Sequence, residues 1–132
     1  MIGDDITEKS RASGYDKIIN RYGGIVMGIF DFWKQPDINQ GVNEYLHSKG
    51  ARLLDVRTPA EYMQGHIPGS MNLPLHNLEE VEYLLNDKEE PLYVYCHSGA
   101  RSRQAVSQLQ QMGYSNVKNI GGITAYTGKV VA

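Results

Sequence analysis

One cysteine in a short loop offers the clearest chemistry of this 132-residue chain. Cys96 is its single cysteine, and it directly follows the apolar segment 92–95, which is typical of a buried strand. The residues after it run into a predicted helix and are His97, Ser98, Gly99, Ala100, Arg101 and Ser102. Main-chain N–H groups at such a helix start form an anion site, and they are expected to stabilise the Cys96 thiolate. Similar settings lower a thiol pKa from roughly 8.5 to about 3.5–7.5.

Two residues of the loop favour a reactive thiolate over a structural cysteine. Gly99 allows the backbone to curl without a Cβ clash, as a tight cradle requires. Arg101 adds a permanent positive charge beside the thiol. The alternative is a buried, inert core cysteine. A glycine and an arginine within five residues after the cysteine are typical of an anion-binding loop instead, so we predict that Cys96 is a nucleophile.

Strands and helices alternate on both sides of this loop. Apolar runs predict strands over residues 52–56, 71–73, 92–95 and 116–120. Helical spacing and capping residues predict helices over 37–47, 58–63, 75–86 and from 101 or 102 to 112. This order predicts right-handed βαβ crossovers and an α/β fold with a mostly parallel sheet covered by helices on both faces. Ligands collect beyond the carboxyl ends of such strands, which is where Cys96 lies.

Five segments in this order resemble a single-domain rhodanese, a sulfurtransferase module of the thiosulfate sulfurtransferase type. The resemblance covers roughly residues 37–126. The matching segments are Leu54-Asp55-Val56-Arg57, Glu61-Tyr62, Gly65-His66-Ile67-Pro68-Gly69-Ser70 with Asn72 and Pro74, Tyr95-Cys96-His97-Ser98-Gly99-Ala100-Arg101-Ser102, and Gly121-Gly122-Ile123. The resemblance implies a rhodanese-like three-layer α/β/α domain over residues 37–132.

The resemblance also implies a ping-pong reaction. The Cys96 thiolate takes sulfane sulfur from a donor such as thiosulfate and passes it, as a persulfide, to a thiol or cyanide acceptor. The loop 97–102 surrounds the persulfide, and no metal or organic cofactor is expected. Asp55 and Arg57 are supporting residues at the end of the first core strand. Asp55 either pairs with Arg101 and holds the loop open or has an ordinary capping role. His66 is interpreted as a hydrogen-bonded brace.

Two departures from the family pattern concern specificity. Rhodaneses with strong thiosulfate activity often carry basic residues directly after the cysteine, where this chain has His97 and Ser98. We therefore expect thiosulfate to be a poor physiological donor. Tyr126 stands where the family commonly has tryptophan, which predicts a short final helix.

Two other functions use similar residues. One is a sulfur-relay or redox-sensing binding module, in which Cys96 exchanges sulfur with, or is oxidised for, a partner protein with little small-molecule turnover. The other is a cysteine phosphatase or arsenate reductase, whose wider loop places five residues between cysteine and arginine. Only four residues separate Cys96 from Arg101, and this tighter ring suits a single projecting sulfur atom.

Composition narrows the partners and the location. The chain has 13 Lys and Arg against 15 Asp and Glu, a formal charge of −2, and no long basic run. Binding to nucleic acid or to an anionic membrane is therefore not expected. No apolar run is long enough to span a bilayer and no secretory signal pattern is present, so a cytoplasmic location is expected.

The first 36 residues are predicted to be a poorly structured leader. Residues 1–26 are polar and interrupted by glycine, without helical or alternating periodicity. They are interpreted as a tag or as the result of a start assigned upstream of a natural start at Met27. The aromatic side chains of Phe30, Phe32 and Trp33 are expected either to pack onto the domain or to form a docking patch.

Overall fold

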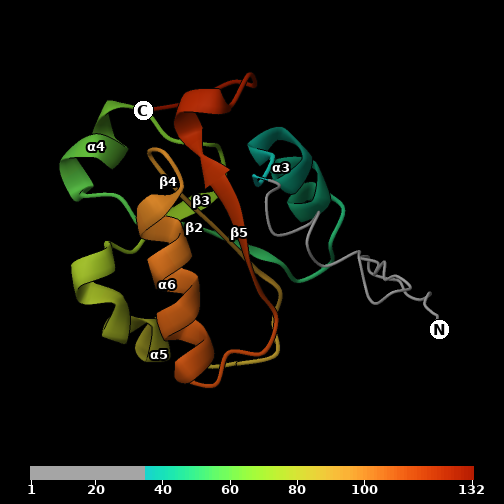
Figure 1. Ribbon diagram of the computed structural model, residues 1–132, viewed down its shortest axis with the longest axis vertical. Coiled ribbons are helices and arrows are strands. Elements are labelled where there is room, and N and C mark those ends of the chain that lie inside the picture. The colour runs from blue at the N-terminus through green and yellow to red at the C-terminus, as the bar shows by residue number, and fades with distance from the viewer. Residues whose placement is uncertain (1–34) are drawn as a thin grey trace, which may run out of the picture. The chain divides into compact units, whose positions relative to one another are not determined.

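Four parallel strands form the central sheet of the described part of the chain (Figure 1). The structure is a computed structural model that describes residues 35–132. The strands lie in the order β3-β2-β4-β5, and all three pairings between neighbours are parallel. Their bounds are Arg52–Asp55 for β2, Ser70–Asn72 for β3, Leu92–Cys96 for β4 and Val117–Gly122 for β5. The prediction of a mostly parallel sheet is confirmed.

The predictions made for the N-terminal segment lie outside the described residues. They concern the leader, the start at Met27 and the aromatic residues Phe30, Phe32 and Trp33. Residues 36–132 form one compact unit.

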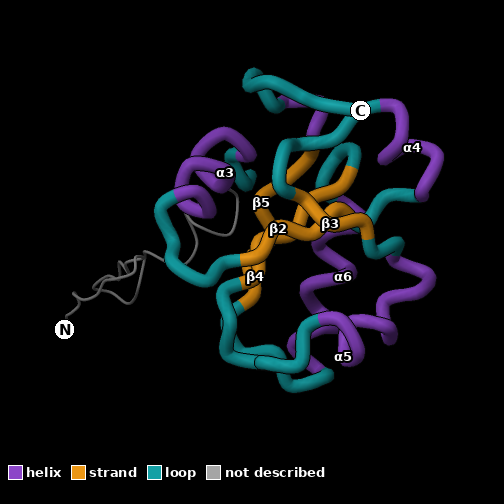
Figure 2. Tube along the Cα trace, turned by 180° about the vertical axis from the view of Figure 1, so that it is seen from behind, coloured by secondary structure: helices purple, strands orange, loops and turns teal. Residues whose placement is uncertain are grey.

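Helices cover both faces of the sheet, as Figure 2 shows. Helix α3 (Ile38–Leu46) packs on one face, where Ile38 joins a buried cluster with Leu53 and Tyr95. Helix α6 (Ala100–Gln111), the 3-10 helix η1 (Leu75–Glu80) and α5 (Val81–Leu84) cover the other face. The cluster on that side contains Leu54 and Cys96, because successive residues of a strand point to opposite faces. The predicted α/β/α layering is confirmed, and the thiol belongs to the α6 side.

The short helix α4 (Pro59–Gln64) begins at the predicted cap. The Thr58 side chain accepts a hydrogen bond from the Glu61 amide, and the Glu61 carboxylate accepts one from the Thr58 amide. This reciprocal capping box satisfies two amides that the first turn leaves unpaired. Pro59 occupies the first helical position, where its missing N–H costs nothing.

The helix predicted over residues 75–86 is broken into two. Asn77 has non-helical backbone angles, φ −120° and ψ 25°, inside the 3-10 segment, and the α-helical part ends at Leu84. Helical spacing over residues 75–86 predicts that Leu78, Val81, Leu84 and Leu85 share one buried face. Leu84 is 49% exposed, whereas Leu85 just after the helix is buried. The prediction for Leu84 was wrong because the kink changes which side chains share a face.

The segment after α4 is held by His66, as the brace interpretation expected. Its main chain exchanges two hydrogen bonds with Val131, of 2.8 and 2.9 Å. Its ring lies flat against Tyr62 at 3.7 Å between centroids, and Nδ1 lies 2.9 Å from the Tyr62 carbonyl oxygen. A last 3-10 helix, η2 (Ile123–Ala125), follows β5 and ends before Tyr126, which agrees with the short final helix that was predicted.

Candidate active site

The sulfur of Cys96 lies at the centre of a ring of hydrogen-bond donors. The cysteine is the last residue of β4, and the loop from His97 to Gly99 leads directly into α6. Sγ accepts hydrogen bonds from the Gly99 amide at 3.0 Å and the Ser102 amide at 3.3 Å. The Ser102 hydroxyl lies 3.5 Å from the same sulfur. The loop thus points its main-chain N–H groups inward, as the sequence predicted.

These donors lower the pKa of the Cys96 thiol. Burial acts in the opposite direction, because it disfavours the charged form of a side chain that is 1% exposed. The hydrogen bond between Sγ and the Ser102 hydroxyl and those from the amides of Ser102, Gly99 and Ser98 together outweigh that cost. The ring therefore favours the nucleophilic thiolate even though the thiol is buried.

A second polar side chain holds the Ser102 hydroxyl in place. Ser102 is fully buried, and its Oγ donates to Asn119 Oδ1 at 2.7 Å and lies 3.0 Å from the Gly99 carbonyl oxygen. Asn119 Oδ1 also accepts from the Gly121 amide at 3.0 Å, which fixes the amide group of Asn119. The hydroxyl is therefore held by a side chain of β5, the strand that pairs with β4.

Two glycines permit the loop to take this shape. Gly99 caps α6 with φ +104°, a left-handed conformation that side chains other than glycine rarely adopt. Gly122 packs directly under the loop, where an added Cβ would lie 2.3 Å from the His97 carbonyl oxygen and 2.5 Å from Ser98 Cα. A register shift between Val94 and Tyr95 sets Gly122 opposite Cys96. The lack of a side chain at Gly122 therefore allows the thiol loop to pack directly against β5.

Asp55 pairs with Arg57 and not with Arg101. The Asp55 carboxylate is buried and accepts from Arg57 Nε at 3.0 Å, from Nη2 at 2.6 Å and from the Arg57 amide at 2.9 Å. Arg57 Nη2 also donates to the Gly65 carbonyl oxygen at 2.7 Å. The pair ties the end of β2 to the segment after α4. Of the two roles expected for Asp55, the ion pair with Arg101 was wrong, because the Arg57 side chain, two positions along the chain, occupies the carboxylate.

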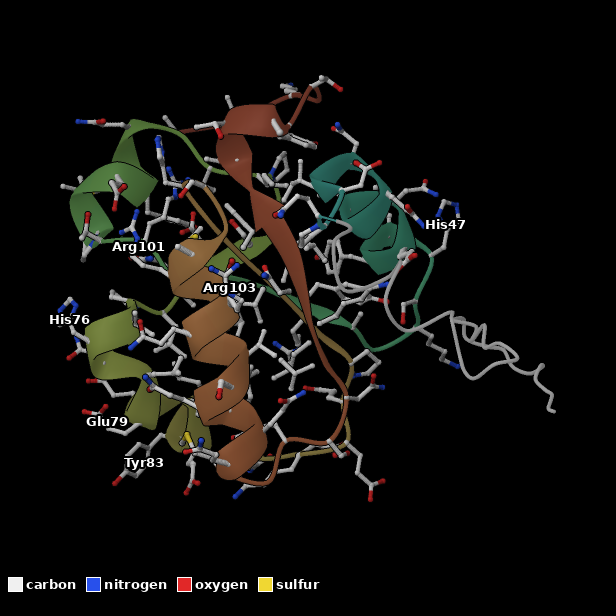
Figure 3. The ribbon with its side chains drawn as sticks, in the orientation of Figure 1. His47, His76, Glu79, Tyr83, Arg101 and Arg103 are labelled. Atoms are coloured by element: carbon white, nitrogen blue, oxygen red, sulfur yellow. The ribbon has the colours of Figure 1, made fainter. Side chains whose placement is uncertain are left out.

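Arg101 binds Glu61 instead. Its guanidinium donates through Nη1 to Oε1 at 2.8 Å and through Nη2 to Oε2 at 3.0 Å, the bidentate geometry that favours an arginine and a carboxylate. Figure 3 shows Arg101 at the start of α6, on the side facing α4, which carries Glu61. Hydrogen bonds from Arg101 are the main cause that lowers the pKa of Glu61 to about 2.

A pocket of about 300 Å³ opens beside the loop. Its lining residues are Arg57, Glu61, Gln64, Gly65, His97 and Ile123. The side chains of His97, Ser98 and Ala100 are exposed, whereas Cys96, Gly99 and Ser102 are buried. Of the predicted loop residues, Gly99 and Ser102 hydrogen-bond to the sulfur, whereas Arg101 binds Glu61. Arg57 lines the adjoining pocket.

Two residues of the site were missed by the sequence-based reasoning. Glu61 was noted as part of a family segment, and the pattern Thr58-x-x-Glu61 signals a capping box but not the partner across the site. Asn119 lies in a strand segment whose sequence carries no sign of a role beside the thiol. Both contacts depend on how α4, β5 and α6 come together.

Residues 35–132 show neither a cluster of metal ligands nor a membrane-spanning helix. No group of three or more His, Cys, Asp or Glu side chains in that part of the chain suits a metal ion. None of its helices is long and apolar enough to cross a membrane.

Comparisons with known proteins identify the family of this chain. Residues 39–129 match the model of the rhodanese-like domain. The chain is 41% identical over 71 residues to the thiosulfate sulfurtransferase PspE of Escherichia coli K12, covering 53% of this chain and 68% of the relative. It is 47% identical over 75 residues to a sulfurtransferase of Allochromatium vinosum, covering 56% of this chain and 69% of the relative.

A solved structure, described as a rhodanese with anions from E. coli, superposes with a TM-score of 0.58 at 36% identity. The match covers 61% of this chain and 96% of that structure. The chain therefore belongs to the rhodanese family of sulfurtransferases. The predictions of the family, of its fold and of a rhodanese-type sulfurtransferase activity are confirmed.

Proposed function

We propose that the protein carries sulfane sulfur as a persulfide on Cys96 and transfers it from a small donor to a thiol or cyanide. The observation that carries this proposal is the convergence of the Gly99 and Ser102 amides on one sulfur atom, at 3.0 and 3.3 Å. Donors in this arrangement stabilise negative charge on sulfur before and after transfer, at no cost of reorganisation.

The reaction consists of two balanced steps. In the first, the Cys96 thiolate attacks the outer sulfur of thiosulfate, the S–S bond of the donor breaks, and sulfite leaves with the bonding electron pair. In the second, a thiolate or cyanide attacks the outer sulfur of the persulfide and releases the Cys96 thiolate. The sulfur moves without its two bonding electrons in both steps, so the cycle needs no external oxidant or reductant.

The residues of the loop have distinct proposed roles. The amides of Ser98, Gly99 and Ser102 lower the pKa of the Cys96 thiol, and the same amides are suited to hold the inner sulfur of the persulfide. The pocket that His97 lines is the proposed place of the donor, because it adjoins the loop. Asp55 and Arg57 are proposed to support the site through their buried ion pair, without touching the reacting atoms.

An intact-mass experiment tests the proposal. The protein is incubated with thiosulfate, freed of small molecules and weighed, alongside a Cys96→Ala variant. The wild type is expected to gain the mass of one sulfur atom, which cyanide or a thiol then removes, and the variant is expected to gain nothing. Sulfur uptake by the variant, or none by the wild type from any donor, would refute the assignment of Cys96. Loading that no acceptor reverses would favour the relay or sensing module.

A further inference from the structure

The two arginines nearest the thiol loop are both bound to carboxylates. Arg57 is in a buried pair with Asp55, and Arg101 is in a bidentate pair with Glu61. Arg103, the next arginine of α6, projects from another side of the helix (Figure 3). The positive charge that Arg101 was expected to add beside the thiol is therefore largely neutralised.

Hydrogen bonds at the start of α4 hold the Glu61 carboxylate independently of Arg101. Its Oε1 accepts hydrogen bonds from the amide and the hydroxyl of Thr58, at 3.0 and 3.1 Å, as part of the cap of α4. Arg101 donates one further hydrogen bond to each of the two carboxylate oxygens. A carboxylate held by four hydrogen bonds from two elements keeps one orientation and stays next to Arg101.

The two residues of the ion pair line different pockets. Glu61 lines the pocket of about 300 Å³ that contains His97 of the thiol loop. Arg101 lines a second pocket of about 370 Å³, together with Thr58 and residues of η1 and α6 that include His76 and Gln104. A donor in the first pocket thus meets the carboxylate side of the pair.

We propose that Glu61 determines the charge of the sulfur donor: by occupying Arg101 and facing the donor pocket, it makes the site prefer monoanionic donors to dianionic ones. The inference rests on the proposed function, because it concerns the same sulfur-loading step. Alkyl persulfides and thiosulfonates carry one charge, whereas thiosulfate carries two.

Electrostatics link Arg101 to the reacting sulfur. The pKa of Arg101 is raised, first by its hydrogen bonds to Glu61 and, to a smaller extent, by the negative charge of Cys96. Negative charge on the Cys96 sulfur and the positive charge of the guanidinium therefore attract each other. The pKa of Glu61, about 2, keeps the carboxylate ionised at every pH at which the thiolate reacts, so the pairing does not switch off.

A matched pair of donors isolates the effect of charge. Methanethiosulfonate differs from thiosulfate by a methyl group in place of one sulfonate oxygen, and so carries one negative charge where thiosulfate carries two. With either donor the Cys96 thiolate attacks the outer sulfur and the S–S bond breaks. Methanesulfinate leaves in one case and sulfite in the other, each with the bonding pair.

The test is the ratio of kcat/KM for thiosulfate to kcat/KM for methanethiosulfonate, measured with cyanide as acceptor in four proteins. Glu61→Gln keeps an acceptor for the Thr58 amide and removes the charge, and it is expected to raise the ratio about fivefold. Arg101→Gln frees the carboxylate and is expected to lower the ratio by a similar factor. The double variant is expected to return within about twofold of the wild type, since the pair is nearly neutral.

The outcomes separate this inference from the proposed function. A Glu61→Gln ratio within twofold of the wild type, or a rise that persists in the double variant, would overturn the role of Glu61 while Cys96 still loads sulfur. Absence of sulfur loading from both donors in the wild type would instead overturn the proposed function. If Glu61→Gln folds poorly, the Arg101→Gln variant serves as the test. Its ratio of kcat/KM values is expected to fall, and an unchanged ratio refutes the inference.

Discussion

Replacing Gly122 with alanine is expected to disrupt the thiolate ring without touching Cys96. The new Cβ would lie 2.3 Å from the His97 carbonyl oxygen and 2.5 Å from Ser98 Cα, and both are main-chain atoms of the loop. Ordinary contacts at such a Cβ begin at 3.4 Å, so the loop must move away by roughly 1 Å. The hydrogen bond from the Gly99 amide to Sγ, now 3.0 Å, would then lengthen and weaken.

The size of the effect follows from that displacement. Overpacking of this kind costs about 1–3 kcal/mol of stability. Misplacing a catalytic group by about 1 Å can cost about 100-fold in rate. The pKa of the Cys96 thiol should rise, because burial continues to disfavour the thiolate while the amides no longer offset it. The acidic limb of the pH–rate profile should therefore move to higher pH.

The assay is the pH dependence of Cys96 alkylation by iodoacetamide, with sulfur loading from thiosulfate measured in parallel. Gly41→Ala is the matched control, because its Cβ would lie 2.4 Å from Ile120 Cβ in the core on the α3 face, away from the loop. It should lose stability and keep the wild-type thiol pKa. A Gly122→Ala protein whose thiol pKa and loading rate equal those of the wild type would refute the reasoning.

Three further predictions concern the polar contacts of the site. Ser102→Ala should raise the pKa of Cys96, seen in the same alkylation profile, because the hydrogen bond between Sγ and the Ser102 hydroxyl is lost; an unchanged profile would contradict this. Arg57→Met should cost about 3–5 kcal/mol in urea unfolding, because the buried carboxylate of Asp55 loses its partner, and a cost under about 1 kcal/mol would argue against it. The pKa of Glu61, about 2 against an ordinary 4.5, means that its bonds stabilise the fold above about pH 4.5 and fade as pH falls toward 2. Glu61→Gln should therefore lower the melting temperature at pH 6 and make little difference at pH 2.

Much of the site could be predicted from the sequence because its parts are local. Cys96, Gly99 and Ser102 lie within seven consecutive residues, so a strand end followed by a helix start is enough to bring their groups together. The cap at Thr58 and Pro59 is local as well, and the structure has it where the sequence indicated. The alternation of predicted strands with predicted helices also predicted the parallel sheet.

The partners of the charged residues could not be predicted in the same way. Asp55 and Arg57 are two positions apart, so the Arg57 side chain can fold back onto the carboxylate. From the sequence, Arg101 was considered as the partner of Asp55 and Arg57 was not. The bond between Arg101 and Glu61 joins residues 40 positions apart. It depends on where α4 sits against the start of α6, which no periodicity encodes.

The kink at Asn77 and the role of Asn119 have similar causes. Asparagine is compatible with a helix as well as with a break, so the apolar spacing of residues 75–86 could not reveal that the helix divides there. Asn119 reaches Ser102 only because β5 lies beside β4. Contacts set by the packing of distant elements are the part that sequence reasoning left out.

The near-complete burial of Cys96 limits the thickness of whatever can reach it. Its side chain is 1% exposed, so the flat surface of a folded protein, including a second copy of this chain, is held off by the residues around it. Two such molecules should not become joined through their cysteines while the loop keeps its shape. A sulfur atom can arrive or leave only on something slender, such as a small anion, a cyanide ion or a thiol at the tip of an extended arm.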